Sequence, residues 1–306
     1  MGKYIARRMV FALLVVVAVT FLSFVLVYLA GDPARSLAGV DTTQENLDRI
    51  RENYGLDRPI YEQYAFFVGN ALQGNLGRSF HFRVDVLPLV VEKFGVTMQL
   101  AVVSLLFSLA VALPLGIISA RNRHQPADHA ATLLSLLGVS TPSFWLGIIL
   151  ILIFADQLRL LPPSGRDDGF RSFILPAIAL SGYNIGLITR LMRRSMLEEM
   201  KKQYVVVAHA KGLNDRRVYL GHALRNALIP TVTVAGLQFG ALLGGSIVVE
   251  TVFAWPGVGF LMIQAIRTND LPVIRAVVLV VGVAFVVINL IVDLMYGVID
   301  PRVVYE

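Results

Sequence analysis

Cysteine and charge are scarce in this 306-residue sequence. There is no cysteine, which excludes disulfides, thiolate zinc sites and cysteine nucleophiles. Only 16% of the residues are charged, whereas about a quarter are charged in a soluble globular domain. Hydrophobic residues make up 56% of the chain and the mean hydropathy is +0.68. This balance predicts an integral membrane protein, in which the net charge of +6 reports topology before it reports partners.

Common signatures of chemistry are also absent. No stretch matches the phosphate-binding loop Gly-x4-Gly-Lys-Ser/Thr, and no serine lies in a Gly-x-Ser-x-Gly elbow. The five histidines lack metal-binding spacing. The apolar runs have no central Asp, Glu or Lys, which argues against proton or sodium coupling. We therefore expect no catalytic residue, no metal site and no cofactor bound by this chain.

Uncharged runs divide the chain into six predicted transmembrane helices. A helix crosses a bilayer with about 20 apolar residues, in a range of about 17 to 25. The first run is longer than the apolar region of a signal peptide, so it is expected to remain as an anchor. The predicted spans are residues 9–31, 94–120, 129–155, 172–189, 226–249 and 276–292.

Basic residues indicate the orientation of these spans. Lys and Arg are in excess in the amino-terminal tail and in a loop at about 190–230, so the positive-inside rule places both termini and this loop in the cytoplasm. The predicted organisation is a cytosolic tail with the first helix (1–31), an extracytoplasmic helical segment (32–93), a five-helix core (94–300) and a cytosolic carboxy-terminal tail (301–306). Within the extracytoplasmic segment, Thr42 and Pro59 are predicted to open helices.

Two features within the spans bear on helix packing. Gly236, Gly240 and Gly244 recur at every fourth position, so another helix can approach one face of the fifth span closely. Packing within this chain and an interface with another subunit both remain open. Prolines that would bend or end a helix occur at Pro114, Pro142 and Pro176.

The stretch "ETVFAWPGVGFL" follows the fifth span. It begins at Glu250, and its Trp255-Pro256-Gly257 sequence breaks a helix between apolar flanks. The stretch is too short to cross the membrane. We expect a re-entrant or interfacial turn on the extracytoplasmic side, with Trp255 at the level of the lipid headgroups.

The stretch "AHAKGLNDRRVYLGHALRN" predicts a basic helical hairpin. A short helix is expected over 204–211, with Gly212 in the left-handed position after its end and Asn214 capping the next helix. Ala208, Ala210 and Gly212 leave one end of the hairpin nearly bare of side chains. Two interpretations fit these residues equally: a loop attracted to anionic lipid, and a docking site for another protein.

Two other classes of protein could account for parts of this sequence. Arg216 and Arg217 fit a membrane-tethered DNA-binding protein, but no linker would let the hairpin reach a major groove, so no nucleic-acid partner is expected. A channel or secondary carrier explains six spans without explaining a docking loop beside an uncharged membrane core.

The stretch "YVVVAHAKGLNDRRVYLGHALRNALIP" resembles the signature loop of permease subunits in ATP-binding-cassette (ABC) importers. Gly212 matches the glycine of the signature and Ile229-Pro230 match its close, whereas His209 stands where the peptide-importing branch usually has arginine. The segments "GDPAR", "YGLDRPIYEQY", "GGSIVVETVFAWPGVG" and "NLIVDLMYGVIDPR" extend the resemblance to the dipeptide, oligopeptide and glutathione permeases. The long segment after the first span resembles the first of the two paired permeases.

This resemblance implies an all-α type I importer fold in the bacterial cytoplasmic (inner) membrane. It implies a heterodimer with a second homologous permease, two cytosolic ATPase subunits that bind ATP and Mg, and an external solute-binding protein that delivers a peptide. The chain itself would not be an enzyme, and its hairpin would be the coupling helix that docks into the ATPase. The residues of this expected coupling loop are Tyr204, Ala208, His209, Ala210, Lys211, Gly212, Leu213 and Pro230.

Overall fold

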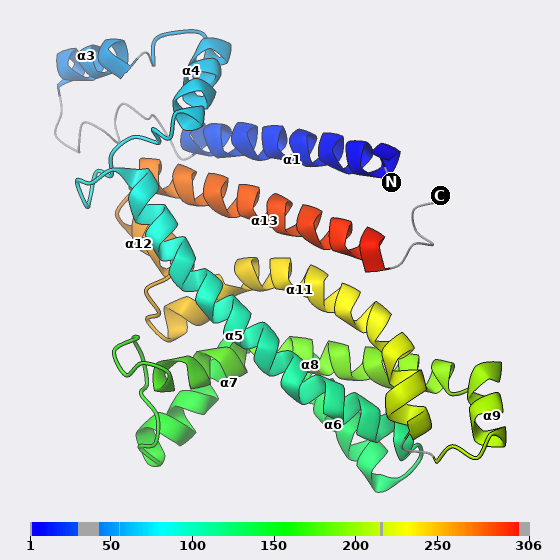
Figure 1. The fold of residues 1–306 in the computed structure, drawn as a ribbon. Helices are drawn as coiled ribbons and strands as arrows, with labels where there is room; N and C mark the ends of the chain where they lie inside the picture. Colours follow the sequence, from blue (N-terminus) through cyan, green and yellow to red (C-terminus); the bar gives the residue numbers. More distant parts are fainter. Residues whose placement is uncertain (1, 30–42, 55, 215–216, 300–306) are drawn as a thin grey trace. The chain divides into compact units, whose positions relative to one another are not determined.

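The computed structural model is helical throughout most of the residues it describes, which are 2–29, 43–54, 56–214 and 217–299 (Figure 1). Within these ranges the structure has no β-strand, and the extended pairing consists of one bridge between Arg78 and Asp85. The prediction of an all-α membrane protein is confirmed.

The chain divides into two compact units. The first comprises Met1–Thr97 and Pro256–Leu290, and the second comprises Met98–Trp255 and Ile291–Glu306. Two long helices contribute to both units. They are α5 (Val86–Arg121) and α13 (Leu271–Ile299).

Five helical segments of the described chain are long and apolar enough to cross a membrane. They are Ile5–Val25, Val86–Arg121, Arg171–Glu199, Val218–Val252 and Leu271–Leu294. A bent pair, made of α6 (Pro126–Ser140) and the helix over Ser143–Gln157, gives the predicted six when it is counted as one span.

The residues of the third predicted span therefore do not form one straight helix. Its two halves are bent by 106°. The break falls at Thr141 and Pro142, which both have extended backbone. Proline disfavours helical conformation in the residue before it, which explains why α6 ends there and α7 (Ser143–Leu150) begins after it. In contrast, α5 continues through Pro114 and α8 through Pro176.

The first unit is built around α1 (Gly2–Leu29), α4 (Ile60–Leu72), α12 (Val258–Arg267) and part of α13. Helices α1 and α13 lie side by side in Figure 1. A Cβ atom added at Gly282 would lie 2.5 Å from Cγ1 of Val19, so this glycine permits the close approach of the two helices. The ring of Phe24 packs against Tyr64 and Phe67, which joins α4 to α1.

Both helices predicted within 32–93 are present in the first unit. They are α3 (Gln44–Tyr54) and α4, whose N-cap is Pro59 as predicted. Thr42, the predicted cap of α3, lies outside the described residues. Further along, the buried carboxylate of Asp270 accepts hydrogen bonds from the Ser79 hydroxyl (2.5 Å) and the His81 N–H (3.1 Å), which fixes the loop before α5 against the start of α13.

Helix α8 (Arg171–Glu199) is the most buried candidate span in the structure. In the most apolar 18-residue stretch of α8, 61% of the residues are buried, whereas the corresponding value for α1 is 11%. Helix α8 is therefore the helix around which the second unit packs. Small residues permit the contact with α6: a Cβ atom at Gly138 would lie 2.5 Å from the carbonyl oxygen of Gly182. The other elements of this unit are η1 (Ile151–Gln157), α9 (Gln203–Ala210), η2 (Val218–Ala223) and α11 (Leu224–Val252).

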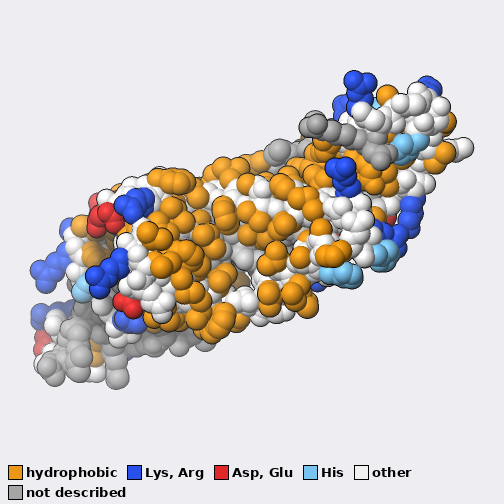
Figure 2. Space-filling view, turned by 90° about the horizontal axis from the view of Figure 1, so that it is seen from below, with side chains coloured by type: hydrophobic (Ala, Val, Ile, Leu, Met, Phe, Trp, Pro, Cys, Tyr) orange, Lys and Arg blue, Asp and Glu red, His pale blue; other side chains and the backbone are white. Residues whose placement is uncertain are grey.

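Large apolar side chains are exposed along the candidate spans. Hydrophobic side chains cover most of the face shown in Figure 2. Helix α1 exposes Phe11 and Leu14, and α6 exposes Leu133 and Leu137, each by more than half of its surface. Exposure of this extent is expected where the surrounding solvent is lipid.

Candidate functional site

The predicted hairpin is present, and its first helix ends as the sequence predicts. Helix α9 is followed by Gly212 with φ of +79°. The Gly212 N–H donates to the carbonyl of His209 (2.9 Å) and the Leu213 N–H donates to that of Ala208 (3.3 Å). These two bonds form a Schellman motif, which requires the left-handed conformation that glycine adopts at little cost.

The second helix of the hairpin begins under the cap that the sequence predicts. The side-chain Oδ1 of Asn214 accepts a hydrogen bond from the Arg217 N–H at 3.0 Å. Arg216 lies outside the described residues. The helix then runs without a break through η2 and α11 to Val252, so Pro230 of the expected coupling loop lies inside a continuous helix.

One side of α9 packs against η2, and the other is exposed. Val205, Ala208 and Val218 form a small buried cluster. The prediction that Ala208 belongs to a bare surface is therefore wrong, because its side chain turns inward to fill this cluster. The outer side exposes Val206 (61%) and Val207 (47%), two apolar residues to which the sequence analysis gave no role.

Five further residues of the expected coupling loop lie at the tip of the hairpin. Their side chains extend the outer side of α9 with small, polar and cationic groups. The exposed residues at this tip are His209, Ala210, Lys211 and Gly212, with Leu213 partly buried. No heavy atom lies within 4 Å of the position that a Cβ atom of Gly212 would occupy, so the tip is open to a partner.

A hydrogen-bond network joins α9 to α8 and α11. We call it the Glu199 network; its members are Glu199, Lys202, Tyr204 and Asn226. The Tyr204 hydroxyl donates to Oε2 of Glu199 (2.6 Å), and Nζ of Lys202 lies 2.5 Å from Oε1. Nδ2 of Asn226 donates to the Tyr204 hydroxyl oxygen (3.1 Å). Burial, helped by the bond to Glu199, raises the pKa of Tyr204 above its ordinary value, so the hydroxyl keeps its proton.

A buried ion pair fixes the turn between α5 and α6 to α8. The carboxylate of Asp128, which is 4% exposed, lies 2.7 Å from Nε of Arg193 and 2.8 Å from its Nη2. It also accepts hydrogen bonds from the Ser119 hydroxyl (2.5 Å) and the His124 N–H (3.0 Å). Neither this pair nor the Glu199 network was predicted, because residue type alone does not show which polar side chains will pair across helices.

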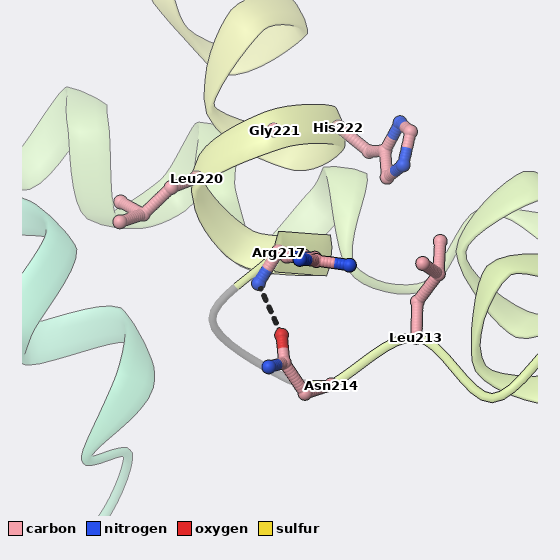
Figure 3. Close-up of a pocket in the computed structure, with 6 residues that line it drawn as sticks. All are labelled: Leu213, Asn214, Arg217, Leu220, Gly221 and His222. Atoms are coloured by element: carbon pink, nitrogen blue, oxygen red, sulfur yellow. Dashed lines mark hydrogen bonds between the residues drawn. The ribbon is translucent and has the colours of Figure 1, made fainter.

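A pocket of about 660 Å³ opens beside the tip of the hairpin (Figure 3). The bond from Arg217 to Asn214 crosses its wall, and Leu220 and His222 point away from each other. Its lining combines two leucines and a glycine with the polar side chains of an asparagine, an arginine and a histidine. The lining residues are Leu213, Asn214, Arg217, Leu220, Gly221 and His222.

The glycine face of α11 is used in two ways. A Cβ atom at Gly236 would lie 2.9 Å from Cγ1 of Val292, so this glycine packs against α13 within the chain. Gly240 is buried. Gly244 has no heavy atom within 4 Å of its Cβ position, which leaves that end of the face open to lipid or to another subunit.

The turn after α11 differs from the expectation in the place of its tryptophan. Trp255 is fully buried, so its ring does not face the lipid headgroups. It meets the ring of Phe173 edge-on at 4.6 Å, with the guanidinium of Arg166 at 5.8 Å. The backbone N–H of Trp255 donates to the carbonyl of Glu250 (2.8 Å), and Ala254 before it has φ of +46°. Protein packing, and not the membrane interface, therefore holds this side chain.

The fold and the hairpin define a class of membrane protein, and comparison with known proteins identifies it. Residues 112–305 match the family described as "Binding-protein-dependent transport system inner membrane component", and residues 1–101 match "Binding-prot-dependent transport system membrane comp, N-term". The chain belongs to this family of permease subunits of ABC importers. It is accordingly a multi-pass protein of the inner membrane.

Full-length relatives narrow the class. The chain is 38% identical over 307 residues to the glutathione transport system permease protein GsiC of Escherichia coli O6:H1, with 100% of each chain covered. It is 37% identical over 335 residues to the dipeptide transport system permease protein DppB of Escherichia coli K12, with 99% of each covered. The resemblance to this branch of permeases is thereby confirmed.

Two solved structures share the fold. One is the MetNI methionine ABC transporter in inward-facing conformations, with a TM-score of 0.56 at 19% identity, covering 69% of this chain and 96% of the other. The other is an amino acid ABC transporter with histidines, with a TM-score of 0.53 at 15% identity, covering 72% and 99%. The type I importer fold is therefore confirmed.

Proposed function

We propose that this chain is the permease subunit through which an ABC importer moves short peptides, such as dipeptides, oligopeptides or glutathione-like compounds, into the cytoplasm. The family gives the importer, and the names of the two full-length relatives support the peptide class of substrate. The second half of the pathway would come from a homologous permease, in a heterodimer with this chain.

The hairpin is the observation that carries the proposal. It presents an exposed apolar side, Val206 and Val207, next to the open tip at Gly212, and its inner side is fixed to the candidate spans. A lipid-binding loop needs only charge, whereas a surface that must receive force needs a rigid attachment. We therefore assign α9 as the coupling helix that docks on a cytosolic ATPase subunit.

In this proposal ATP and Mg bind to two ATPase subunits, while this chain neither binds nor hydrolyses nucleotide. The support is the missing phosphate-binding loop in the sequence. An external solute-binding protein would deliver the peptide to the opposite side of the membrane. The chain would contact peptide and lipid but no nucleic acid, in keeping with a second hairpin helix that continues into α11 without a linker.

Reconstitution tests the proposal. The complete complex, purified with its binding protein, is placed in liposomes, and uptake of a labelled dipeptide or glutathione is measured with and without ATP on the ATPase side. We expect uptake only with ATP, and none from this chain alone. Uptake by the lone chain without nucleotide would identify a channel or secondary carrier, and would overturn the proposal.

A further inference from the structure

Three helices of the second unit meet at one buried carboxylate. Glu199 is the last residue of α8 and is 8% exposed. Tyr204 belongs to α9 and Asn226 to α11, and their side chains form a continuous chain of hydrogen bonds that ends on Glu199. The carboxylate thus connects the proposed coupling helix to both of the candidate spans that flank it in the sequence.

The tyrosine is not needed to neutralise this carboxylate. Lys202 already pairs with Oε1 of Glu199 at 2.5 Å, and its side chain is 56% exposed, so its own charge stays hydrated. Loss of the Tyr204 hydroxyl would leave the carboxylate paired and close to water. If the Tyr204 hydroxyl served only to stabilise the charge of Glu199, it would therefore be partly redundant with Lys202.

The tyrosine hydroxyl has a property that lysine lacks, which is that it donates and accepts at once. It donates to Glu199 at the end of α8 and accepts from Asn226 in the first turn of α11. Removing the hydroxyl breaks both bonds at one point. Within the Glu199 network, Tyr204 is therefore the member that joins α9 to α11.

Helix α9 is also held by hydrophobic packing. Val205 and Ala208 of α9 are buried with Val218, and Met200 and Leu213 pack against this cluster. Such contacts are non-directional, so they resist separation of α9 from η2 more than they resist rotation or sliding. Hydrogen bonds are directional and fix the register of the helix.

We propose that Tyr204 is a positioning residue that makes the coupling helix move as one body with α8 and α11. Force applied by the ATPase to the exposed side of α9 then reaches the spans instead of being lost in rotation of α9. This inference rests on the proposed function, because it assumes that α9 is the surface on which the ATPase acts.

The test measures how much transport each ATP produces. The complete complex carrying Tyr204→Phe is reconstituted in liposomes with its binding protein, and peptide uptake and ATP hydrolysis are measured in the same vesicles. We expect the complex to assemble at parent levels and hydrolyse ATP, with uptake per ATP reduced about 5- to 30-fold, the factors that correspond to one and to two net hydrogen bonds. The control is Tyr61→Phe, because Tyr61 is 69% exposed in α4, outside the network.

A second variant keeps the inference testable if Tyr204→Phe does not assemble. Asn226→Ala removes the bond to α11 while leaving that between Tyr204 and Glu199, and it is expected to lower uptake per ATP in the same direction. Unchanged uptake per ATP in an assembled Tyr204→Phe complex would overturn the inference. Failure of both variants to assemble would also overturn it, because the network would then serve folding alone.

Failure of the proposed function has a different signature. If the parent complex takes up no peptide with ATP, or the ATPase subunits do not co-purify with it, the importer itself is misassigned. If the parent complex transports normally and Tyr204→Phe does so with equal efficiency, the importer stands and only the role of Tyr204 is wrong.

Discussion

Replacing Gly212 with valine is the substitution that best separates a docking surface from a lipid-facing loop. The backbone at Gly212 has φ of +79°, a conformation that costs a residue with a Cβ atom about 1–2 kcal/mol. No heavy atom lies within 4 Å of the added Cβ, so no clash within the chain increases this cost. The candidate spans are untouched, and Gly212→Val should insert and accumulate at near-parent levels.

The expected loss is in coupling. The valine side chain would project from the tip of the hairpin into the space that a docked partner occupies, and the strained turn would shift the end of α9. We expect the full complex to lose both uptake and substrate-stimulated ATP hydrolysis. These are measured in liposomes that contain equal amounts of complex, as judged by quantitative immunoblotting.

A second glycine of the same chain provides a matched control. Gly77 has φ of +88° and also has no heavy atom within 4 Å of its Cβ position, so Gly77→Val introduces the same backbone strain in the first unit. Asn214→Ala, which removes a helix cap worth about 1 kcal/mol, should be milder than Gly212→Val. If Gly212→Val transports as well as the parent, or only as poorly as Gly77→Val, the docking role of the tip is wrong.

Three further predictions test the packing and the topology. Asp128→Ala leaves the largely buried Arg193 without its partner, so it should cost about 3 kcal/mol of stability and lower the melting temperature of the purified complex. Arg194→Ala, which removes an exposed pair, should leave the melting temperature unchanged. Equal effects of the two variants would contradict a structural role of the buried pair. Gly240→Leu should reduce assembly or transport, because Gly240 is buried in α11; a fully active variant would place that face in lipid. Cysteines introduced at Asn46 and Asn214 should be labelled from opposite sides of the membrane, and labelling from one side would refute the orientation.

The local features of the hairpin were predictable from the sequence. The end of α9 depends on Gly212 and the start of η2 on Asn214, and each acts through bonds to residues at most five positions away. Short-range preferences of this kind are read directly from residue type. The same reasoning located Pro59 at the start of α4. Of the three prolines expected to bend or end a helix, only Pro142 lies at a break in the described helices, whereas Pro114 and Pro176 lie inside α5 and α8.

The features that the sequence did not reveal depend on contacts between distant residues. Asp128 and Arg193 are 65 positions apart, and nothing in either neighbourhood distinguishes them from the other charges that flank the spans. Trp255 is amphipathic, which suits the membrane interface, but its ring is buried and packs edge-on against Phe173, which is far away in the sequence. In these cases the partner decides the role of the side chain, and the partner is known only from the fold.

Helical periodicity explains the partial failure at Ala208. Small residues at 208, 210 and 212 indicate a bare surface only if they share a face of the hairpin. Ala208 instead lies three positions after Val205, so both belong to the side of α9 that is buried against Val218. The exposed side consequently begins with Val206 and Val207.

The central claim is that α9 contacts an ATPase subunit, and cross-linking from its tip tests this most directly. The chain has no cysteine, so a single cysteine at the exposed position Ala210 can carry a benzophenone photo-cross-linker without a competing site in this chain. On illumination of the assembled, transport-competent complex, we predict a covalent adduct between this chain and an ATPase subunit, identified by mass spectrometry, together with loss of uptake. Adducts to lipid alone, from a complex that still transports, would contradict the account.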